Sequence, residues 1–349
     1  MLKHTLFAAL ALFLGGAAHA QTQQANPLFQ SNDPIAFTIE APFDTLLRTA
    51  ARSTDPQPAS FTLTNPAAAP VDLQVSPRGL SRRTRDYCGF PPLRLDFQRS
   101  AMTGTLMAGQ NRLKLVTHCR ATDAYEQNVV LEYLAYRLFN TLTPQSYRVR
   151  PATVTYRDRE GRRSEVTRFG FLIEDVDDMA RRNGGRENDT SSGRVPLASL
   201  EPRQAARVAL FNYMIGNLDW SLIDGPEPDE CCHNTRTIAR AAGAPLAVVP
   251  YDFDNSGFVS APYAEPPAGV GVAHVRTRLY RGFCTHNGQL PAVVGEFRAQ
   301  RAAMLALIAN ETRISQNLRQ RATRYIEDFY AILDDPARFE RSVVSRCRG

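Results

Sequence analysis

The chain has 349 residues, of which 22% are charged, and its formal net charge is +6. This length suits two packed lobes or domains. The charge is mild and the arginines are spread along the chain rather than gathered with aromatic residues, so the sequence does not indicate nucleic-acid binding. Beyond the N-terminal run described next, no stretch approaches the roughly 20 apolar residues of a transmembrane helix.

The first 20 residues have the pattern of a secretory signal peptide. A short basic start precedes an apolar run over residues 6–14, and Ala18-His19-Ala20 offers small residues around a cleavage point. We therefore expect an exported protein, periplasmic or secreted, that is cleaved after about Ala20. Residues 21–35 are polar, and we expect them to form a flexible N-terminal segment.

Alternation of apolar and polar residues predicts a β-rich N-terminal unit over residues 36–175. A helix is predicted from about residue 124 to residue 142, because apolar residues recur there at helical spacing. The predicted strands, separated mostly by Pro, Asn, Asp and Gly turns, cover residues 36–40, 60–64, 71–75, 93–97, 112–117, 147–157 and 168–173.

A mostly helical unit with catalytic and metal-binding loops is predicted over residues 176–349. The acidic stretch from Glu174 to Asp178 has the character of a hinge followed by a helix start. An apolar strand is expected at residues 246–249. The predicted helices of this unit cover residues 202–215, about 292–309 and 313–333.

The six cysteines of an exported chain favour disulfides over metal ligands. Cys88 and Cys119 each close a strand-like run, so we expect them to pair with each other. That bond would join the segment before the predicted strand at 93–97 to the end of the predicted strand at 112–117.

The other four cysteines leave the connectivity open. Cys231 and Cys232 are adjacent and a bond between them would be strained, so we expect each to bond elsewhere. Cys284 and Cys347 are the candidate partners. A zinc site around Cys231, Cys232 and His233 is the alternative, although no second ligand pair has the spacing of a metal site.

Lysine is almost absent from this arginine-rich chain. Lys3 lies in the predicted signal peptide, which leaves Lys114 as the single lysine of the mature protein. An ammonium on a flexible stem differs from the guanidinium fork in size and geometry. The retention of Lys114 on a predicted strand therefore suggests a phosphate-binding lysine, and the alternative is a solvent-facing cation.

Three short segments of the C-terminal unit carry oxygen side chains suited to phosphoryl transfer. Asp219 follows the helix at 202–215, Asn234 follows later, and Asp252 and Asp254 come directly after the apolar strand. Phosphoryl transfer needs a carboxylate for the acceptor hydroxyl, an amide and a carboxylate for metal, and a cation over the phosphates. The order Lys, Glu on a helix, Asp, Asn and Asp supplies these roles.

These segments resemble a known family. Arg78-Gly79-Leu80-Ser81 followed by the strand at 93–97 is similar to the arginine-glycine loop and strand of the spore coat protein H-like (CotH) atypical kinases. Asn217 to Asp219, Asn234 and the Tyr251 to Asp254 segment are similar to the catalytic and metal segments of that family. The resemblance covers roughly residues 70–285. It implies an α+β, protein-kinase-like fold of two lobes.

The resemblance also implies roles for individual residues. Asp219 would be the catalytic carboxylate, Lys114 the phosphate-binding cation and Glu132 the residue that orients this lysine, or Glu126 if the helix is rotated. The remaining implied residues are Arg78, Gly79, Ser81 and Glu174 for the cofactor and Asn234, Asp252 and Asp254 for the metal. The cofactor would be ATP or another nucleoside triphosphate with Mg²⁺ or Mn²⁺, and the acceptor a hydroxyl of a protein or small molecule.

Two other functions remain open for the same residues. The run Asp252 to Gly257 matches the opening of a calcium loop, with oxygen side chains at positions one, three and five and glycine at position six. Position twelve is Tyr263, where such a loop needs a bidentate Glu. A non-catalytic, exported calcium-binding or scaffold module is therefore the alternative to an exported kinase.

Overall fold

The computed structural model describes residues 24–190, 193–225 and 231–349. The predicted signal peptide lies outside these residues. Within them, every helix is too short or too polar to cross a membrane.

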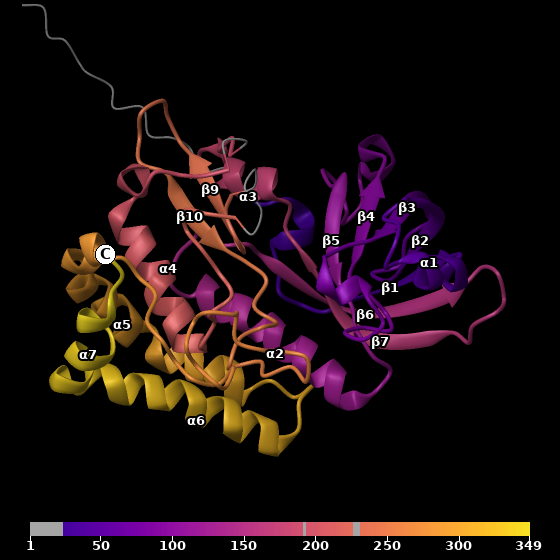
Figure 1. Ribbon diagram of the computed structural model, residues 1–349. Helices are drawn as coiled ribbons and strands as arrows, with labels where there is room; N and C mark the ends of the chain where they lie inside the picture. Colours follow the sequence, from indigo (N-terminus) through magenta and orange to yellow (C-terminus); the bar gives the residue numbers. More distant parts are fainter. Residues whose placement is uncertain (1–23, 191–192, 226–230) are drawn as a thin grey trace, which may run out of the picture.

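Seven strands of the N-terminal half close into a β-barrel with the order β1-β2-β3-β4-β5-β7-β6 (Figure 1). All neighbouring pairs are antiparallel except β1 and β6, whose parallel pairing closes the barrel. The strands are β1 (Ile35–Ala41), β2 (Gln57–Asn65), β3 (Val71–Pro77), β4 (Leu93–Phe97), β5 (Arg112–Val116), β6 (Val149–Asp158) and β7 (Val166–Ile173).

The barrel interior follows from the period-two patterns of the strands. In β1 every second residue is buried, and β2 and β4 repeat this alternation. The buried side chains of the strands form one apolar cluster together with those of α1 (Phe43–Thr49) and of the segment before β1. The barrel is therefore filled by side chains.

The longer helices lie on the other side of the molecule from the barrel, and among them α2 (Asp123–Asn140) packs closest to it (Figure 1). Outward-facing residues of β5 and β7, such as Val116 and Phe171, join the large apolar cluster of the helical half. This cluster includes α4 (Pro202–Ile215), α5 (Leu290–Ala309) and α6 (Gln316–Leu333), with α7 (Pro336–Ser342) packed against it. The two halves thus share buried surface along α2.

A small sheet of order β10-β9-β8 completes the structure. It consists of β8 (Arg186–Glu187), β9 (Thr235–Ala239) and β10 (Ala247–Pro250), and α3 (Val176–Arg182) precedes it. The predicted strands and helices are confirmed to within a few residues at each end. Their local patterns were therefore sufficient to identify the elements.

The predicted two-lobed, protein-kinase-like arrangement is wrong, although the α+β composition is right. The structure has a closed mixed barrel of seven strands, a small sheet and C-terminal helices. The parallel pairing of β1 with β6 joins strands more than 100 residues apart along the chain. Alternation within a strand fixes which face is buried, but it does not identify a distant partner.

The segment before β1 also differs from its prediction. Residues 24–34 were expected to be flexible, yet Leu28 and Phe29 are buried in the barrel cluster. The Arg150 guanidinium donates to the carbonyl oxygens of Leu28 and Ser31, at 3.1 and 2.9 Å. A buried arginine on β6 thus holds this polar segment in place.

Three disulfides join the six cysteines. The predicted bond between Cys88 and Cys119 is confirmed. The expectation that Cys231 and Cys232 bond elsewhere is wrong, because they bond to each other. Cys284 bonds to Cys347, since the C-terminal segment returns beside residue 283 in a parallel bridge.

We predict that this connectivity is found in the oxidised protein. Non-reducing peptide mapping should give one cross-linked pair containing Cys88 and Cys119 and another containing Cys284 and Cys347. The peptide with Cys231 and Cys232 should be about 2 Da lighter than its reduced form, with no cross-link to another peptide. A fully reduced sample is the control. A cross-link from Cys231 or Cys232 to any other cysteine would contradict the structure.

Candidate functional site

The predicted site residues meet between the barrel and the segments that flank the small sheet. Lys114 lies on β5, and the leucines on either side of it in the sequence are buried and face the barrel interior. The Lys114 side chain therefore lies on the opposite, outer face of the strand. The loop after β3 supplies Arg78 and Arg82, and α2 supplies Glu132. The other members, which come from segments before β9, on β9 or after β10, are Asp219, His233, Asn234, Arg236, Asp252 and Asp254. These ten residues are called the candidate site below.

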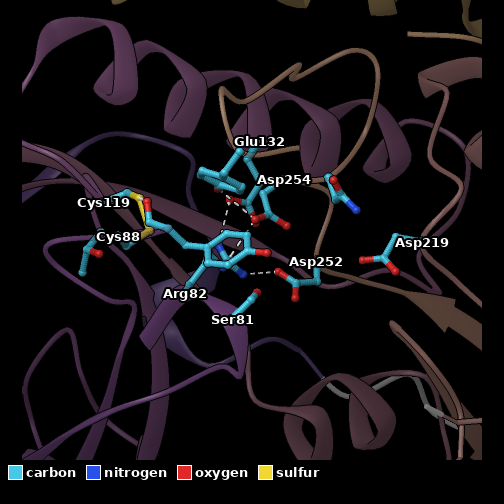
Figure 2. A network of polar contacts seen from close by, with 12 residues as sticks. Ser81, Arg82, Cys88, Cys119, Glu132, Asp219, Asp252 and Asp254 are labelled. Atoms are coloured by element: carbon cyan, nitrogen blue, oxygen red, sulfur yellow. Dashed lines mark hydrogen bonds and ion pairs between the residues drawn. A yellow bond between two sulfur atoms is a disulfide. The ribbon is translucent and has the colours of Figure 1, made fainter. Parts of the chain in front are cut away.

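The centre of the candidate site is the buried guanidinium of Arg82, which meets three carboxylates (Figure 2). It donates a hydrogen bond to Oδ1 of Asp252. Its Nε lies 3.3 Å from Oδ2 of Asp254, and its Nη1 lies 3.7 Å from Oε2 of Glu132. The Tyr263 hydroxyl donates to Asp254 at 2.9 Å. One cation therefore joins the loop after β3, helix α2 and the segment after β10.

The three carboxylates respond differently to this environment. Burial would raise the pKa of Asp252, but the charges of Arg82 and Arg78 outweigh it and hold this pKa below its usual value. Burial raises the pKa of Asp254 despite Arg82. The pKa of Glu132 is raised well above its usual value, again chiefly by burial. Arg82 thus stabilises the three carboxylates unequally, and Asp252 is the one whose charged form is most favoured.

A second feature is a group of three cations beside Asp252. Burial, followed by the charges of Arg78 and Arg236, lowers the pKa of Lys114 to about 7. The Lys114 ammonium lies 5.0 Å from the centre of the Tyr251 ring, and the Arg236 guanidinium lies 5.3 Å from the same ring. The charges of Asp175 and Asp252 only partly offset this effect on Lys114. Arg236 also pairs with Glu187 at 3.3 Å, so the three cations share their surroundings with several carboxylates, and at Lys114 the effects of burial and of the two guanidinium groups are the larger ones.

A third feature is a hydrogen-bonded group around Asp219. Nε2 of His233 lies 2.6 Å from Oδ1 of Asp219. The Asn234 amide donates to the backbone carbonyl of Asp219 at 2.7 Å and to its Oδ2 at 3.2 Å. The hydrogen bond to Asp219 raises the pKa of His233 above its ordinary value, against the effect of burial. Both carboxylate oxygens of Asp219 are therefore oriented by neighbouring side chains.

The segments that carry Asp219 and Asp252 are fixed to each other by their backbones. Residues 217 and 256 form an antiparallel bridge, and Gly257 donates to the carbonyl of Gly216 at 3.0 Å. A Cβ on Gly216 or on Gly257 would lie 2.1 or 2.5 Å from the Tyr325 hydroxyl. Only glycine fits at either position, and the close approach of the two segments depends on this.

Asn234 and Asp252 share an uncommon backbone conformation. Their φ angles are 51° and 62°, in the left-handed region that few residues other than glycine adopt. Tyr251 donates its backbone N–H to the carbonyl of Asn234 at 2.9 Å. Asp252 donates its backbone N–H to the hydroxyl oxygen of Tyr136, on α2, at 2.9 Å. Such strained residues concentrate at functional sites.

The structure brings most of the predicted site residues together but changes some of their partners. Glu132 was expected to orient Lys114, and its partner is Arg82 instead. The alternative residue Glu126 accepts from the backbone N–H of Phe169 and lies away from the lysine.

Three predicted cofactor residues have more limited roles. Glu174 is buried and binds Arg182 through both oxygens, at 3.0 and 2.8 Å, so it stabilises the start of α3 rather than facing a ligand. Gly79 has a φ of 86° and allows the turn after Arg78. Ser81 is exposed and lies beside Arg82 (Figure 2).

Sequence reasoning missed Arg82, Arg236 and the pairing of His233 with Asp219. Arg82 follows directly after the Arg78-Gly79-Leu80-Ser81 run that carries the resemblance, so the sequence could have indicated it as a site residue. Arg236 faces the candidate site because it lies opposite residue 249 in the register of β9 and β10, which no local pattern reveals.

The oxygen side chains of the Asp252–Gly257 run mostly have partners within the protein. Asp252 and Asp254 bind Arg82, and Asn255 pairs with the backbone of Glu265 in both directions. Among the described residues, no group of three or more His, Cys, Asp or Glu side chains is arranged to hold a metal ion. A divalent ion here would need additional oxygens from a ligand, as Mg²⁺ commonly does with phosphates.

Comparisons with known proteins assign no family to the chain. No protein-family model matches the chain. No curated protein matches it either. The similarity to the CotH kinases therefore stays a prediction from short motifs, and a function has to be inferred from the arrangement of the side chains.

We predict that Arg82→Met destabilises the protein. The substitution leaves three buried carboxyl groups without their cation, which typically costs about 3–5 kcal/mol at neutral pH. Without Arg82, burial would raise their pKa values above those of the unfolded chain, so stability would fall as the pH rises above about 4. Urea denaturation at pH 4 and pH 7.5 should show the larger deficit at pH 7.5. Arg85→Met, which removes an exposed neighbouring cation, is the control. Equal deficits for both variants at pH 7.5 would argue against the network.

We predict the opposite effect for Lys114→Met. The pKa of Lys114 is lowered in the folded state, so the unfolded chain binds more protons between about pH 7 and 10 and wild-type stability rises with pH across this window. The variant should lack this rise and should be about 1–3 kcal/mol more stable at pH 7, a magnitude reduced for the partial exposure of the side chain. Denaturation between pH 6 and 10 measures both effects. Arg112→Met, an exposed cation on the same strand, should keep the wild-type pH dependence.

Proposed function

We propose that the candidate site binds a nucleoside triphosphate together with a divalent metal ion and transfers a phosphoryl group to a hydroxyl acceptor. The observation that carries this proposal is the convergence of three cations: Arg78 and Arg236 both act on Lys114, and Lys114 and Arg78 act on Asp252. Arg236 also pairs with Glu187 at 3.3 Å. Like charges gathered in a partly buried place repel one another. A polyanion between them would turn this repulsion into attraction.

The three cations differ in the contacts that they offer to phosphates. Guanidinium groups bind phosphate oxygens in a bidentate manner, whereas an ammonium acts as a compact point charge. A bound phosphate would stabilise the protonated form of Lys114, whose pKa is about 7 in the protein alone. Triphosphate binding should therefore be accompanied by uptake of a proton near neutral pH.

Asp252 and Asn234 are the residues that would hold the metal ion. Oδ1 of Asp252 binds Arg82, which leaves Oδ2 for a ligand, and the Asn234 amide donates to Asp219 through its nitrogen, which leaves Oδ1. Mg²⁺ typically takes one or two such protein ligands and completes its shell with phosphate oxygens and water. The ion would neutralise charge on the phosphates during transfer.

Asp219 is suited to position the acceptor and to receive its proton. The acceptor oxygen would attack the terminal phosphorus, the bond from this phosphorus to the bridging oxygen would break, and the nucleoside diphosphate would leave. The proton of the hydroxyl would pass to the pair formed by Asp219 and His233, which is joined by a 2.6 Å hydrogen bond. The N-terminal signal pattern makes exported proteins or small molecules the expected acceptors.

The first test is ligand binding by the mature, oxidised protein. We expect ATP with MgCl₂ or MnCl₂ to raise the melting temperature of the wild type, because the ligand binds only the folded state. Asp252→Ala should abolish the metal-dependent part of this increase without unfolding the protein. Asp334→Ala, a substitution at the end of α6, is the matched control. Stabilisation by CaCl₂ alone would favour the calcium-binding module, and no response to any of these ligands would overturn the proposal.

The second test separates binding from chemistry. Asp219→Asn should retain ATP binding within a few fold and slow phosphoryl transfer by about 10²–10⁴-fold, since a positioned base acts on the chemical step. Where no acceptor is supplied, water can take its place, and the formation of ADP measures turnover. An Asp219→Asn variant that binds and turns over ATP like the wild type would refute the assigned role.

A further inference from the structure

A cavity separate from the candidate site lies beside the C-terminal end of α2. Its volume is about 560 Å³, which is within the range of small-molecule sites. The last turn of α2, the loop that leads from it to β6, the segment before β1 and the end of α3 form its walls. None of the ten residues of the candidate site lines it.

Three arginines and no acidic residue line this cavity. They are Arg137, Arg148 and Arg182. Arg182 is buried, and its charge is compensated because it binds both carboxylate oxygens of Glu174, at 3.0 and 2.8 Å. It also donates to two backbone carbonyls of the loop after α2. The positive charge that the cavity can offer to a ligand therefore comes from the other two arginines.

Arg137 and Arg148 have only neutral partners. Nη1 of Arg148 donates to the backbone carbonyl of Phe29 at 2.9 Å, and Nη1 of Arg137 donates to the Tyr133 hydroxyl at 2.8 Å. Within the part of the chain that the structure describes, neither guanidinium forms an ion pair with a carboxylate, and their other N–H groups make no hydrogen bond. Both side chains are partly exposed, so a ligand in the cavity can reach them.

The acids in the neighbourhood are bound to other groups. Burial and the charge of Arg182 lower the pKa of Arg148, and the charge of Glu174 offsets this effect only in part. Asp33 does not line the cavity, and its carboxylate accepts a hydrogen bond from the Ser31 hydroxyl at 2.5 Å. Because an arginine stays protonated at physiological pH, the two guanidinium groups keep their charge and their free donors.

We propose that this cavity binds a small organic dianion, either a dicarboxylate or a phosphate monoester. Guanidinium groups form strong, charge-assisted hydrogen bonds to the oxygens of both kinds of group, and two charges on the ligand match the two arginines. The exposed side chains of Gln30 and Asn32 offer amide groups to the polar part of such a ligand. This site is independent of the proposed phosphoryl transfer, because the two share no residue.

The test compares succinate, monomethyl succinate and succinamide, which share one carbon chain and carry two, one and no negative charges at pH 7.5. Calorimetric titration of the full mature protein at low salt should show that succinate binds about 10-fold more tightly than monomethyl succinate, with succinamide weakest. Glycerol 3-phosphate is the second dianion, and the tighter of the two identifies the source of the charge. Equal affinities of succinate and its monoester, or no saturable binding of either dianion, would overturn the proposal.

Arginine variants locate the binding. Arg148→Met and Arg137→Met should each weaken the tighter dianion by about 10-fold, because each removes one charge-assisted contact. Arg324→Met is the matched control, since Arg324 is an exposed arginine of α6 that does not line the cavity. An equal loss in the control would contradict the assignment. A loss in Lys114→Met without a loss in Arg148→Met would place the dianion in the candidate site and would also refute it.

A pair of substitutions at Asn32 tests the charge without removing any contact of the arginines. Asn32 is exposed at the edge of the cavity, so neither substitution should disturb folding. Asn32→Asp should weaken the dianion by about 2–5-fold, and Asn32→Lys should strengthen it by a similar factor, as expected for a partly screened charge. Thermal melting of each variant checks that the fold is kept. Equal affinities in the two variants would show that charge at this cavity does not govern binding and would overturn the proposal.

Discussion

The contact between Arg82 and its three carboxylates is the constraint on which the candidate site depends. The barrel and the helical half approach each other there, and each contributes charge that could not be buried alone. The guanidinium stays protonated at any physiological pH, so the contact does not switch with small pH changes. Arg82 also lies six residues before Cys88, whose disulfide to Cys119 fixes the same loop to the end of β5. The loop after β3 is thus held at both ends.

This arrangement divides the candidate site into two electrostatic halves. Arg82 neutralises part of the acidic half, formed by Glu132, Asp252 and Asp254, from the inside of the molecule. In the basic half around Lys114, Arg236 pairs with Glu187 at 3.3 Å, and the charge of Arg78 influences both halves. An anionic ligand with a metal ion would complement both halves at once, with phosphates beside the cations and the ion beside Asp252. This complementarity is a stronger argument than any single residue.

The sequence was a good guide to local structure and a poor guide to distant pairings. The alternation in β1, β4 and β5 and the helical spacing in α2 depend on nearest neighbours, so these elements were predicted within a few residues. Closure of the barrel depends on a parallel pairing of β1 with β6, and nothing within either strand encodes it.

The same distinction applies to the site and to the disulfides. Asp219, Asn234 and Asp252 were singled out because oxygen side chains at the ends of elements form a recognisable local pattern. The partner of Glu132 was assigned incorrectly, because a lysine on the neighbouring strand was the only cation that the pattern singled out. The structure instead places the arginine of a preceding loop there. Cys231 and Cys232 were judged by strain alone, whereas the bridge between residues 283 and 348 already commits Cys284 to Cys347.

The different electrostatic surroundings of Arg82 and Lys114 offer a physical reason for a single lysine in a chain that otherwise uses arginine. Arg82 has three carboxylates, so a permanent charge is stabilised there. Lys114 has two cationic neighbours, and burial together with their charges lowers its pKa to about 7. An arginine at position 114 could not release its proton, and three permanent charges would repel one another whenever no anion was bound. With a pKa of about 7, Lys114 can lose its proton near neutral pH, and it would regain its charge if an anion were bound, so a lysine suits both states.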